Sequence, residues 1–87
     1  MRPAYRVYIL RNPQNRHYIG LSEDVSVRLE QHNSGGSKWT AKYRPWSLIW
    51  QSGELSLTDA RKLENQLKRQ KGGRGLYQLT GLNPPGS

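Results

Sequence analysis

Two short runs of aromatic and β-branched residues constrain the fold more than any other feature of the chain. Residues 4–10 have apolar side chains on both faces, which is typical of a strand that is covered on both sides. Residues 11–15 are turn formers and include Pro13, which has no N–H to donate to a strand ladder. Residues 17–21 then predict a second strand. Strands joined by so short a turn must be antiparallel, so we expect a β-hairpin.

A helix is predicted after the hairpin. Residues 22–24 offer capping side chains and negative charge at its N-terminus. Val25 and Leu29 lie four residues apart and are expected to face the core of a helix that spans about 25–32. A second row at the same spacing is polar and consists of Asp24, Arg28 and His32.

The second half of the sequence predicts a loop, a strand and another helix. Residues 34–45 have the composition of a basic loop, and 46–50 are expected to form a third strand. A second helix begins at 56–59, and Gly72-Gly73 stop it. The apolar stripe of this helix comprises Ala60, Leu63 and Leu67.

These elements follow one another in the order β-β-α-β-α. The expected class is α+β, with a three-stranded antiparallel sheet flanked by helices and a short further element near residues 76–79. A chain of 87 residues has room for one core, so we expect a single domain over 1–82. Residues 83–87 are rich in proline and read as a frayed tail.

The charge balance predicts the partner. The chain has 14 Lys and Arg against 6 Asp and Glu, a net charge of +8, while only 33% of its residues are hydrophobic. A basic domain with a thin core is expected to bind a polyanion, because each neutralised phosphate releases counterions. We find no signal peptide and no apolar run of the roughly 18–20 residues that span a bilayer, and therefore expect a cytoplasmic protein without membrane contact. The lack of cysteine excludes disulfides and thiolate chemistry.

The few acidic residues limit the candidates for a metal ligand. Hydrolysis of a phosphodiester needs an activated water and positive charge near the phosphate, and a hard divalent ion prefers carboxylate oxygen. Glu64 is the one acid in mid-helix beside an apolar stripe. The structural alternative is that Glu64 only forms an ion pair with Arg61 or Lys68, at helical spacing.

An ordered set of matches resembles the GIY-YIG nuclease superfamily, and in particular its small stand-alone members built as a single UvrC-type domain. The resemblance covers about residues 5–71 and keeps ten-residue steps between its first three polar positions. The first signature triplet is Arg6-Val7-Tyr8, so only its tyrosine is retained, and Leu21 stands where some relatives are basic. The matching positions are Tyr8, Tyr18-Ile19-Gly20, Arg28, His32-Asn33 and Glu64.

The resemblance implies a metal-dependent endonuclease that hydrolyses phosphodiester bonds in DNA, as in repair or recombination, and single-stranded and branched DNA are candidate substrates. It implies that Glu64 holds one Mg²⁺ or Mn²⁺ and that Arg28 grips the scissile phosphate. Tyr8 and Tyr18 would line the active site, where one of them helps to deprotonate water, and His32 would transfer a proton or contact phosphate. No organic cofactor is implied. The residues also allow structural roles: hairpin packing for the tyrosines, pairing of Arg28 along its own helix, and a helix-end role for His32.

The expected basic loop mixes cations with aromatic rings, a combination that suits a nucleic-acid groove. Its aromatic members have an alternative, because Trp39 or Tyr43 can instead fold back onto the thin core. Trp46 and Trp50 are expected to be core residues. The predicted nucleic-acid contacts are Lys38, Trp39, Lys42, Tyr43, Arg44 and Lys68.

A non-catalytic module with a nuclease-like fold is the competing hypothesis. The basic loop, the thin apolar content and Leu21 support it. Such a module binds nucleic acid in a salt-sensitive manner without divalent metal. In both hypotheses the expected partner is DNA, with RNA as the alternative, and the family's stand-alone members point to a bacterial source.

Overall fold

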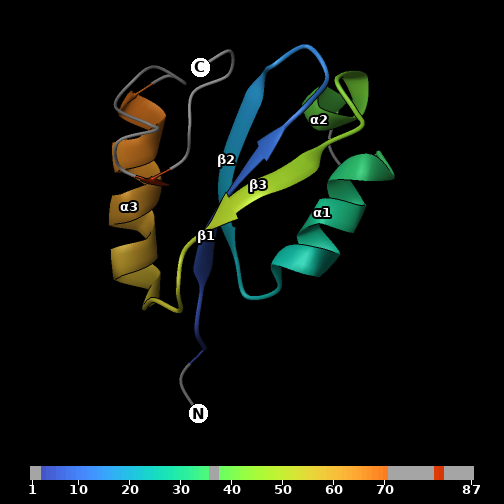
Figure 1. Ribbon diagram of the computed structural model, residues 1–87. Coiled ribbons are helices and arrows are strands. Elements are labelled where there is room, and N and C mark those ends of the chain that lie inside the picture. Colours follow the sequence, from blue (N-terminus) through green and yellow to red (C-terminus); the bar gives the residue numbers. More distant parts are fainter. Residues whose placement is uncertain (1–2, 36–37, 71–79, 82–87) are drawn as a thin grey trace.

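Three antiparallel strands form the centre of the computed structural model, which describes residues 3–35, 38–70 and 80–81. The hairpin strand β1 occupies the middle of the sheet, in the order β2-β1-β3 (Figure 1). Both of its neighbours run antiparallel to it, and Tyr8 lies opposite Gly20 of β2. The strands are β1 (Arg6–Arg11), β2 (His17–Ser22) and β3 (Ser47–Gln51).

Helices cover both faces of this sheet. Figure 1 shows the long C-terminal helix on one side, and the two shorter helices on the other. The predicted α+β class and the order β-β-α-β-α are confirmed. Among the described helices, none has the length and apolar character needed to cross a bilayer. The helices are α1 (Val25–Asn33), α2 (Lys38–Lys42) and α3 (Leu57–Arg69).

The two longer helices begin at side-chain caps. The carboxylate of Asp24 accepts a hydrogen bond from the Val27 N–H at 3.1 Å, at the start of α1. The hydroxyl of Ser56 accepts one from the Asp59 N–H at 3.2 Å, at the start of α3. Each cap satisfies a backbone donor that the first helical turn leaves unpaired, as the sequence predicted.

Two local expectations are wrong. The segment 34–45 is not a loop throughout, because α2 forms within it and buries Thr40. The third strand begins at Ser47 rather than Trp46, because the Asn33 side chain holds the backbone N–H and carbonyl of Trp46. His32 of the polar row is buried, with only 2% of its surface accessible.

The core is divided by the sheet into two clusters. Successive side chains of β1 point to opposite faces, and both faces are buried, as predicted for this strand. Towards α3 the buried cluster is aliphatic and contains Val7, Ile9, Ile19, Ala60 and Leu67. Towards α1 and α2 it contains Tyr8, Leu10, Val25 and Trp46.

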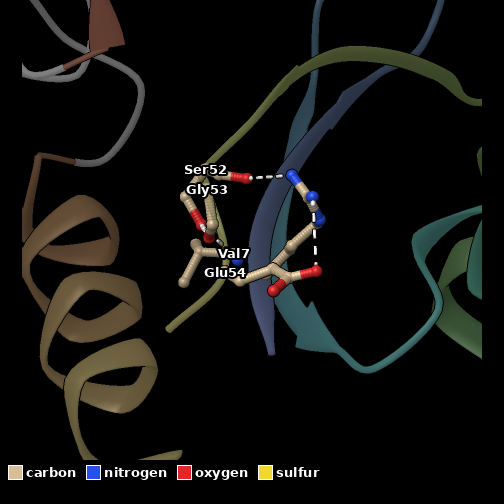
Figure 2. A network of polar contacts seen from close by, with 5 residues as sticks. Val7, Ser52, Gly53 and Glu54 are labelled. Atoms are coloured by element: carbon tan, nitrogen blue, oxygen red, sulfur yellow. Dashed lines mark hydrogen bonds and ion pairs between the residues drawn. The ribbon is translucent and has the colours of Figure 1, made fainter. Parts of the chain in front are cut away.

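A polar network ties the end of β3 to β1 (Figure 2). The Ser52 hydroxyl accepts a hydrogen bond from the Val7 N–H at 2.9 Å and donates to the Gly53 carbonyl at 2.8 Å. Arg6 donates to the Ser52 carbonyl and lies 3.8 Å from the Glu54 carboxylate. These contacts close the sheet at the point where the chain leaves it for α3.

The expected short element near 76–79 and the expected tail at 83–87 lie outside the described residues. The predicted boundary of a domain over 1–82 stays a prediction.

Candidate active site

A buried chain of hydrogen bonds links the central strand to the two shorter helices. The Tyr8 hydroxyl lies 3.0 Å from Nε2 of His32, and Nδ1 of His32 lies 3.1 Å from the Thr40 hydroxyl. All three residues are at most 2% exposed. Three elements (β1, α1 and α2) therefore meet at one imidazole ring.

Gly20 makes room for the Tyr8 ring. A Cβ atom added at Gly20 would lie 2.6 Å from the Tyr8 hydroxyl oxygen and 2.8 Å from Cζ. Real side chains avoid such distances, so a larger residue would force the tyrosine to move. The glycine of the second signature, Tyr18-Ile19-Gly20, thus acts through close approach and places the Tyr8 hydroxyl over β2.

Two charged residues from different helices influence the pKa of the Tyr8 hydroxyl. Burial raises the pKa of Tyr8 to about 12, and the neighbouring Tyr18 adds to this rise. The Arg28 guanidinium lowers the pKa, whereas the Glu64 carboxylate raises it. Tyr8 therefore stays protonated near neutrality, and Arg28 of α1 and Glu64 of α3 both act electrostatically on its hydroxyl.

His32 is held neutral. Burial lowers the pKa of His32 from its ordinary value, and the positive charge of Arg28 lowers it further. A neutral imidazole has one N–H donor and one acceptor nitrogen, so one of its two hydroxyl partners donates and the other accepts. His32 therefore offers a nitrogen that can exchange a proton with Tyr8.

Arg28 and Glu64 differ in how their own helices hold them. Arg28 is exposed and donates to the Gln31 side chain at 2.9 Å, while Asp24, its suggested partner, caps the helix instead. The Glu64 carboxylate lies 3.4 Å from the Lys68 ammonium, so the expected pairing within the helix exists. Glu64 is nonetheless the more buried partner, at 17% side-chain exposure against 54% for Lys68.

Glu64 also fits a role as the protein ligand of a divalent ion. No cluster of three or more acidic, histidine or cysteine side chains that could hold a metal occurs among the described residues. Magnesium keeps several water ligands and commonly takes one or two carboxylates together with substrate phosphate. The Glu64 carboxylate, which is mostly buried and raises the pKa of Tyr8, is compatible with such a site. The site would also need oxygen ligands from the substrate.

An aromatic group borders the Tyr8–His32 pair. The ring of Tyr18 is centred 4.6 Å from the His32 ring and 6.1 Å from the Trp39 ring. Trp39 stacks on Trp46 at 5.6 Å and also contacts Tyr43 at 5.0 Å. Trp39 thus covers the core, as one alternative held, yet it remains 43% exposed.

Cations surround the exposed part of this aromatic group. The Arg16 guanidinium lies 4.3 Å from the centre of the Tyr43 ring, and the Lys42 ammonium lies 5.5 Å from it. Arg44 turns towards α1 and donates to the Asn33 carbonyl at 3.4 Å, while Lys38 is exposed. Of the predicted nucleic-acid residues of this segment, Lys42 and Tyr43 therefore lie beside Trp39, whereas Arg44 lies against α1.

A pocket of about 450 Å³ opens beside β2, which is one of the two edge strands of the described sheet. Tyr18 and Trp39 reach it from the α1 and α2 side of the sheet, and Lys68 reaches it from α3. The hairpin supplies the remaining walls, so residues from both faces meet around the edge. The main lining residues are Arg16, His17, Tyr18, Ile19, Trp39 and Lys68.

The sequence interpretation did not single out three residues that shape the site. Thr40 is the partner of His32, and Arg16 belongs to the pocket. The buried Asn12 accepts hydrogen bonds from two N–H groups of the hairpin turn and donates to the Tyr43 carbonyl at 2.9 Å. Only Asn12 carries a local signal, because asparagine before a turn commonly bonds backbone groups ahead of it.

Comparison with known proteins places the chain in a class. The family model of the GIY-YIG catalytic domain matches residues 4–77. The match extends over most of the chain, so the protein belongs to the GIY-YIG family, as the sequence motifs indicated. Membership implies a nuclease-type function and a nucleic-acid substrate, and members of the family generally use a divalent metal.

Curated relatives narrow the class to small bacterial proteins. The chain is similar to the UPF0213 proteins of Staphylococcus aureus, among them that of strain Mu3, SAV0488 of strain Mu50 and SA0446 of strain N315. Each is 38% identical over 66 residues, which cover 75% of this chain and 80% of the relative. No solved structure gives a significant match.

Proposed function

We propose that this protein is a metal-dependent endonuclease that hydrolyses phosphodiester bonds in DNA. The observation that carries the proposal is the buried contact of 3.0 Å between the Tyr8 hydroxyl and His32, with Arg28 and Glu64 acting on the same hydroxyl. A tyrosine that only packs would need a hydrogen-bond partner for its buried hydroxyl, but it would not need two charged residues beside it. The family's nuclease-type function supports the same role. We place the activity in bacterial DNA repair or recombination.

Tyr8 acts in this proposal as a relay rather than as a free phenolate. A pKa of about 12 leaves little phenolate near neutrality. In this proposal neutral His32 carries its proton on Nδ1 and donates a hydrogen bond to the Thr40 hydroxyl, so that Nε2 accepts one from the Tyr8 hydroxyl. As Tyr8 takes a proton from the attacking water, it gives its own proton to Nε2. The water thus becomes a hydroxide nucleophile while His32 becomes an imidazolium, and Tyr8 itself stays neutral.

Arg28 and Glu64 have complementary electrostatic roles. The Arg28 guanidinium is exposed and can present paired donors to two oxygens of the scissile phosphate. Glu64 would hold the divalent ion, which supplies positive charge for the leaving oxygen when bound. Lys68, which pairs with Glu64 at 3.4 Å, would then be released towards the nucleic acid.

Cleavage of labelled DNA with and without Mg²⁺ or Mn²⁺ tests the proposal. We expect Glu64→Gln and Tyr8→Phe each to lower the rate by about 10²-fold or more, because each removes a group that acts in the transition state. Glu54→Gln is the matched control, since its carboxylate lies 3.8 Å from Arg6, in the structural network at the end of the sheet. It should leave the rate within about twofold.

The same experiment separates the competing hypothesis. Salt-sensitive binding of DNA by the wild type, without metal-dependent products from any DNA, would identify a non-catalytic module and overturn the nuclease proposal. Unchanged cleavage by Glu64→Gln would overturn the metal-ligand role alone.

A further inference from the structure

The pocket at the edge of β2 has a composition that neither proton transfer nor metal binding explains. Trp39 is one of its walls and is 43% exposed, although it belongs to a packed aromatic group. Large exposed aromatic rings that are held in place by neighbours serve recognition, because burying them against a ligand gains free energy at little cost in conformational entropy.

The rings at this wall are rigidly supported. Trp39 stacks on the buried Trp46, with an angle of 29° between the ring planes. The indole N–H of Trp46 donates to the Thr40 carbonyl at 2.8 Å, which anchors the supporting ring to α2. A flat ligand that rests against Tyr18 and Trp39 would therefore meet a surface that is already formed.

The charge of the pocket selects an anionic ligand. Arg16 of the hairpin turn and Lys68 of α3 line its wall, and none of its described lining residues is acidic. Its volume of about 450 Å³ lies within the range of sites that bind small organic molecules. A flat ring attached to a phosphate matches aromatic walls with cations at the rim, which is the chemistry of a nucleotide.

The position of the pocket connects it to the reaction. Tyr18 is shared: it lines the pocket, and its ring is centred 4.6 Å from that of His32. Lys68 is shared as well, because it lines the pocket and pairs with Glu64. A base that rests in the pocket would therefore belong to a nucleotide close to the phosphate that is attacked by the water from which Tyr8 takes a proton.

We infer that this pocket binds an unpaired nucleobase by stacking on Trp39 and Tyr18, so that the protein selects nucleic acid with unpaired nucleotides over intact duplex. In a duplex each base is stacked between its neighbours and has no face to offer. The inference rests on the proposed nucleic-acid substrate, but it concerns recognition and not the cleavage step.

Binding without catalysis tests this inference. We would measure it with Glu64→Gln protein in EDTA, at about 0.1 M salt. The probes are fluorescent single strands of about six nucleotides, in DNA and in RNA, each with one 2-aminopurine, and a longer blunt duplex that contains the same sequence and stays paired under the assay conditions. We expect tighter binding of the single strands and quenching of the 2-aminopurine fluorescence. The DNA and RNA arms show which sugar the adjacent surface accepts.

Substitution of Trp39 gives the decisive comparison. Trp39→Ala should weaken single-strand binding by about 10-fold and duplex binding by less than about twofold, because the loss of one stacked base is confined to unpaired strands. Trp39→Phe should restore part of the affinity. Trp39→Leu keeps apolar bulk against Trp46 but offers no ring, so it should behave as Trp39→Ala even if the alanine variant is less stable.

A matched charge change serves as the control. Lys42→Gln removes a cation beside Tyr43 and should weaken single-strand and duplex binding alike. An equal loss of both affinities in Trp39→Ala and Trp39→Leu, or no loss in either, would overturn the inference and leave a purely electrostatic surface. Because the assay contains no metal and no active Glu64, a failure of the nuclease proposal would appear only in the cleavage assay.

Discussion

The central strand β1 contributes apolar side chains to one face of the sheet and a polar, hydrogen-bonded side chain to the other. Val7 and Tyr8 are neighbours in β1, and both are buried. Val7 belongs to an aliphatic cluster beneath α3, whereas Tyr8 is bonded to the buried His32 beneath α1. One face is filled by side chains that can only pack, and the other contains hydroxyl and imidazole groups that can also exchange protons.

The comparison shows that the face towards α1 and α2 buries polar groups, which requires hydrogen-bond partners for them. A buried polar group is costly unless it is hydrogen-bonded. Within the described residues, every buried side-chain nitrogen and oxygen has a partner. On the α1 and α2 face these partners are other functional candidates, so the chain Tyr8–His32–Thr40 maintains both the packing and the chemistry of that face. The aliphatic cluster beneath α3 contributes stability without a part in the proposed chemistry, to which α3 contributes Glu64 instead.

The largest effect is expected from a cavity on the aliphatic face. Leu67 is fully buried in α3, and Leu67→Ala should lower the free energy of unfolding by about 2–5 kcal/mol. Urea titration measures this loss. The cleavage rate per folded molecule should stay close to that of the wild type, because Leu67 contacts the cluster away from Tyr8. A rate that falls far more than the folded fraction would break the division between the two faces.

A smaller effect is expected from adding one methyl group on the functional face. Gly20→Ala places a Cβ against the Tyr8 ring and should cost about 1–3 kcal/mol of stability, with a marked loss of cleavage as the hydroxyl shifts. Gly53→Ala is the control, because an added Cβ there meets nothing within 4 Å. The same two measurements, unfolding and cleavage, apply to both. Equal behaviour of the two variants would contradict the proposed role of Gly20.

The smallest effect is a pH dependence that compares one histidine from each face. Burial lowers the pKa of both His17 and His32. Below about pH 6.5 the unfolded chain therefore binds more protons than the folded protein does. The free energy of unfolding should be highest above that pH and should decline as the pH falls further. Urea titrations between about pH 8 and pH 5 measure the slope. Both His17→Gln and His32→Gln should flatten it.

Cleavage distinguishes the two histidines where stability does not. If neutral His32 receives the proton of Tyr8, the cleavage rate of the folded protein must also fall as His32 becomes protonated. This acid limb should persist in His17→Gln. If the acid limb instead disappeared in His17→Gln, the group whose protonation lowers the cleavage rate would be His17 in the pocket and not His32.

The residues that could be predicted from the sequence are those with local causes. The hairpin follows from turn formers between β-branched runs, and the starts of the longer helices follow from Asp24 and Ser56. The ordered motif from Tyr8 to Glu64 identified the family, which the match over residues 4–77 shows. Each of these signals lies within a few residues or in the order of residues along the chain.

What the tertiary structure decided depends on contacts between distant segments. Helical spacing placed His32 in a polar row, but its burial against β1 and α2 makes it a partner of Tyr8 and Thr40. The short α2 gains support from the burial of Thr40, because five residues are too few to form a stable helix alone. The pocket joins Arg16, Trp39 and Lys68, which no local pattern relates. The sequence by itself therefore determined the elements other than α2 and the candidate chemistry, whereas packing around β1 and β2 decided which of those groups meet.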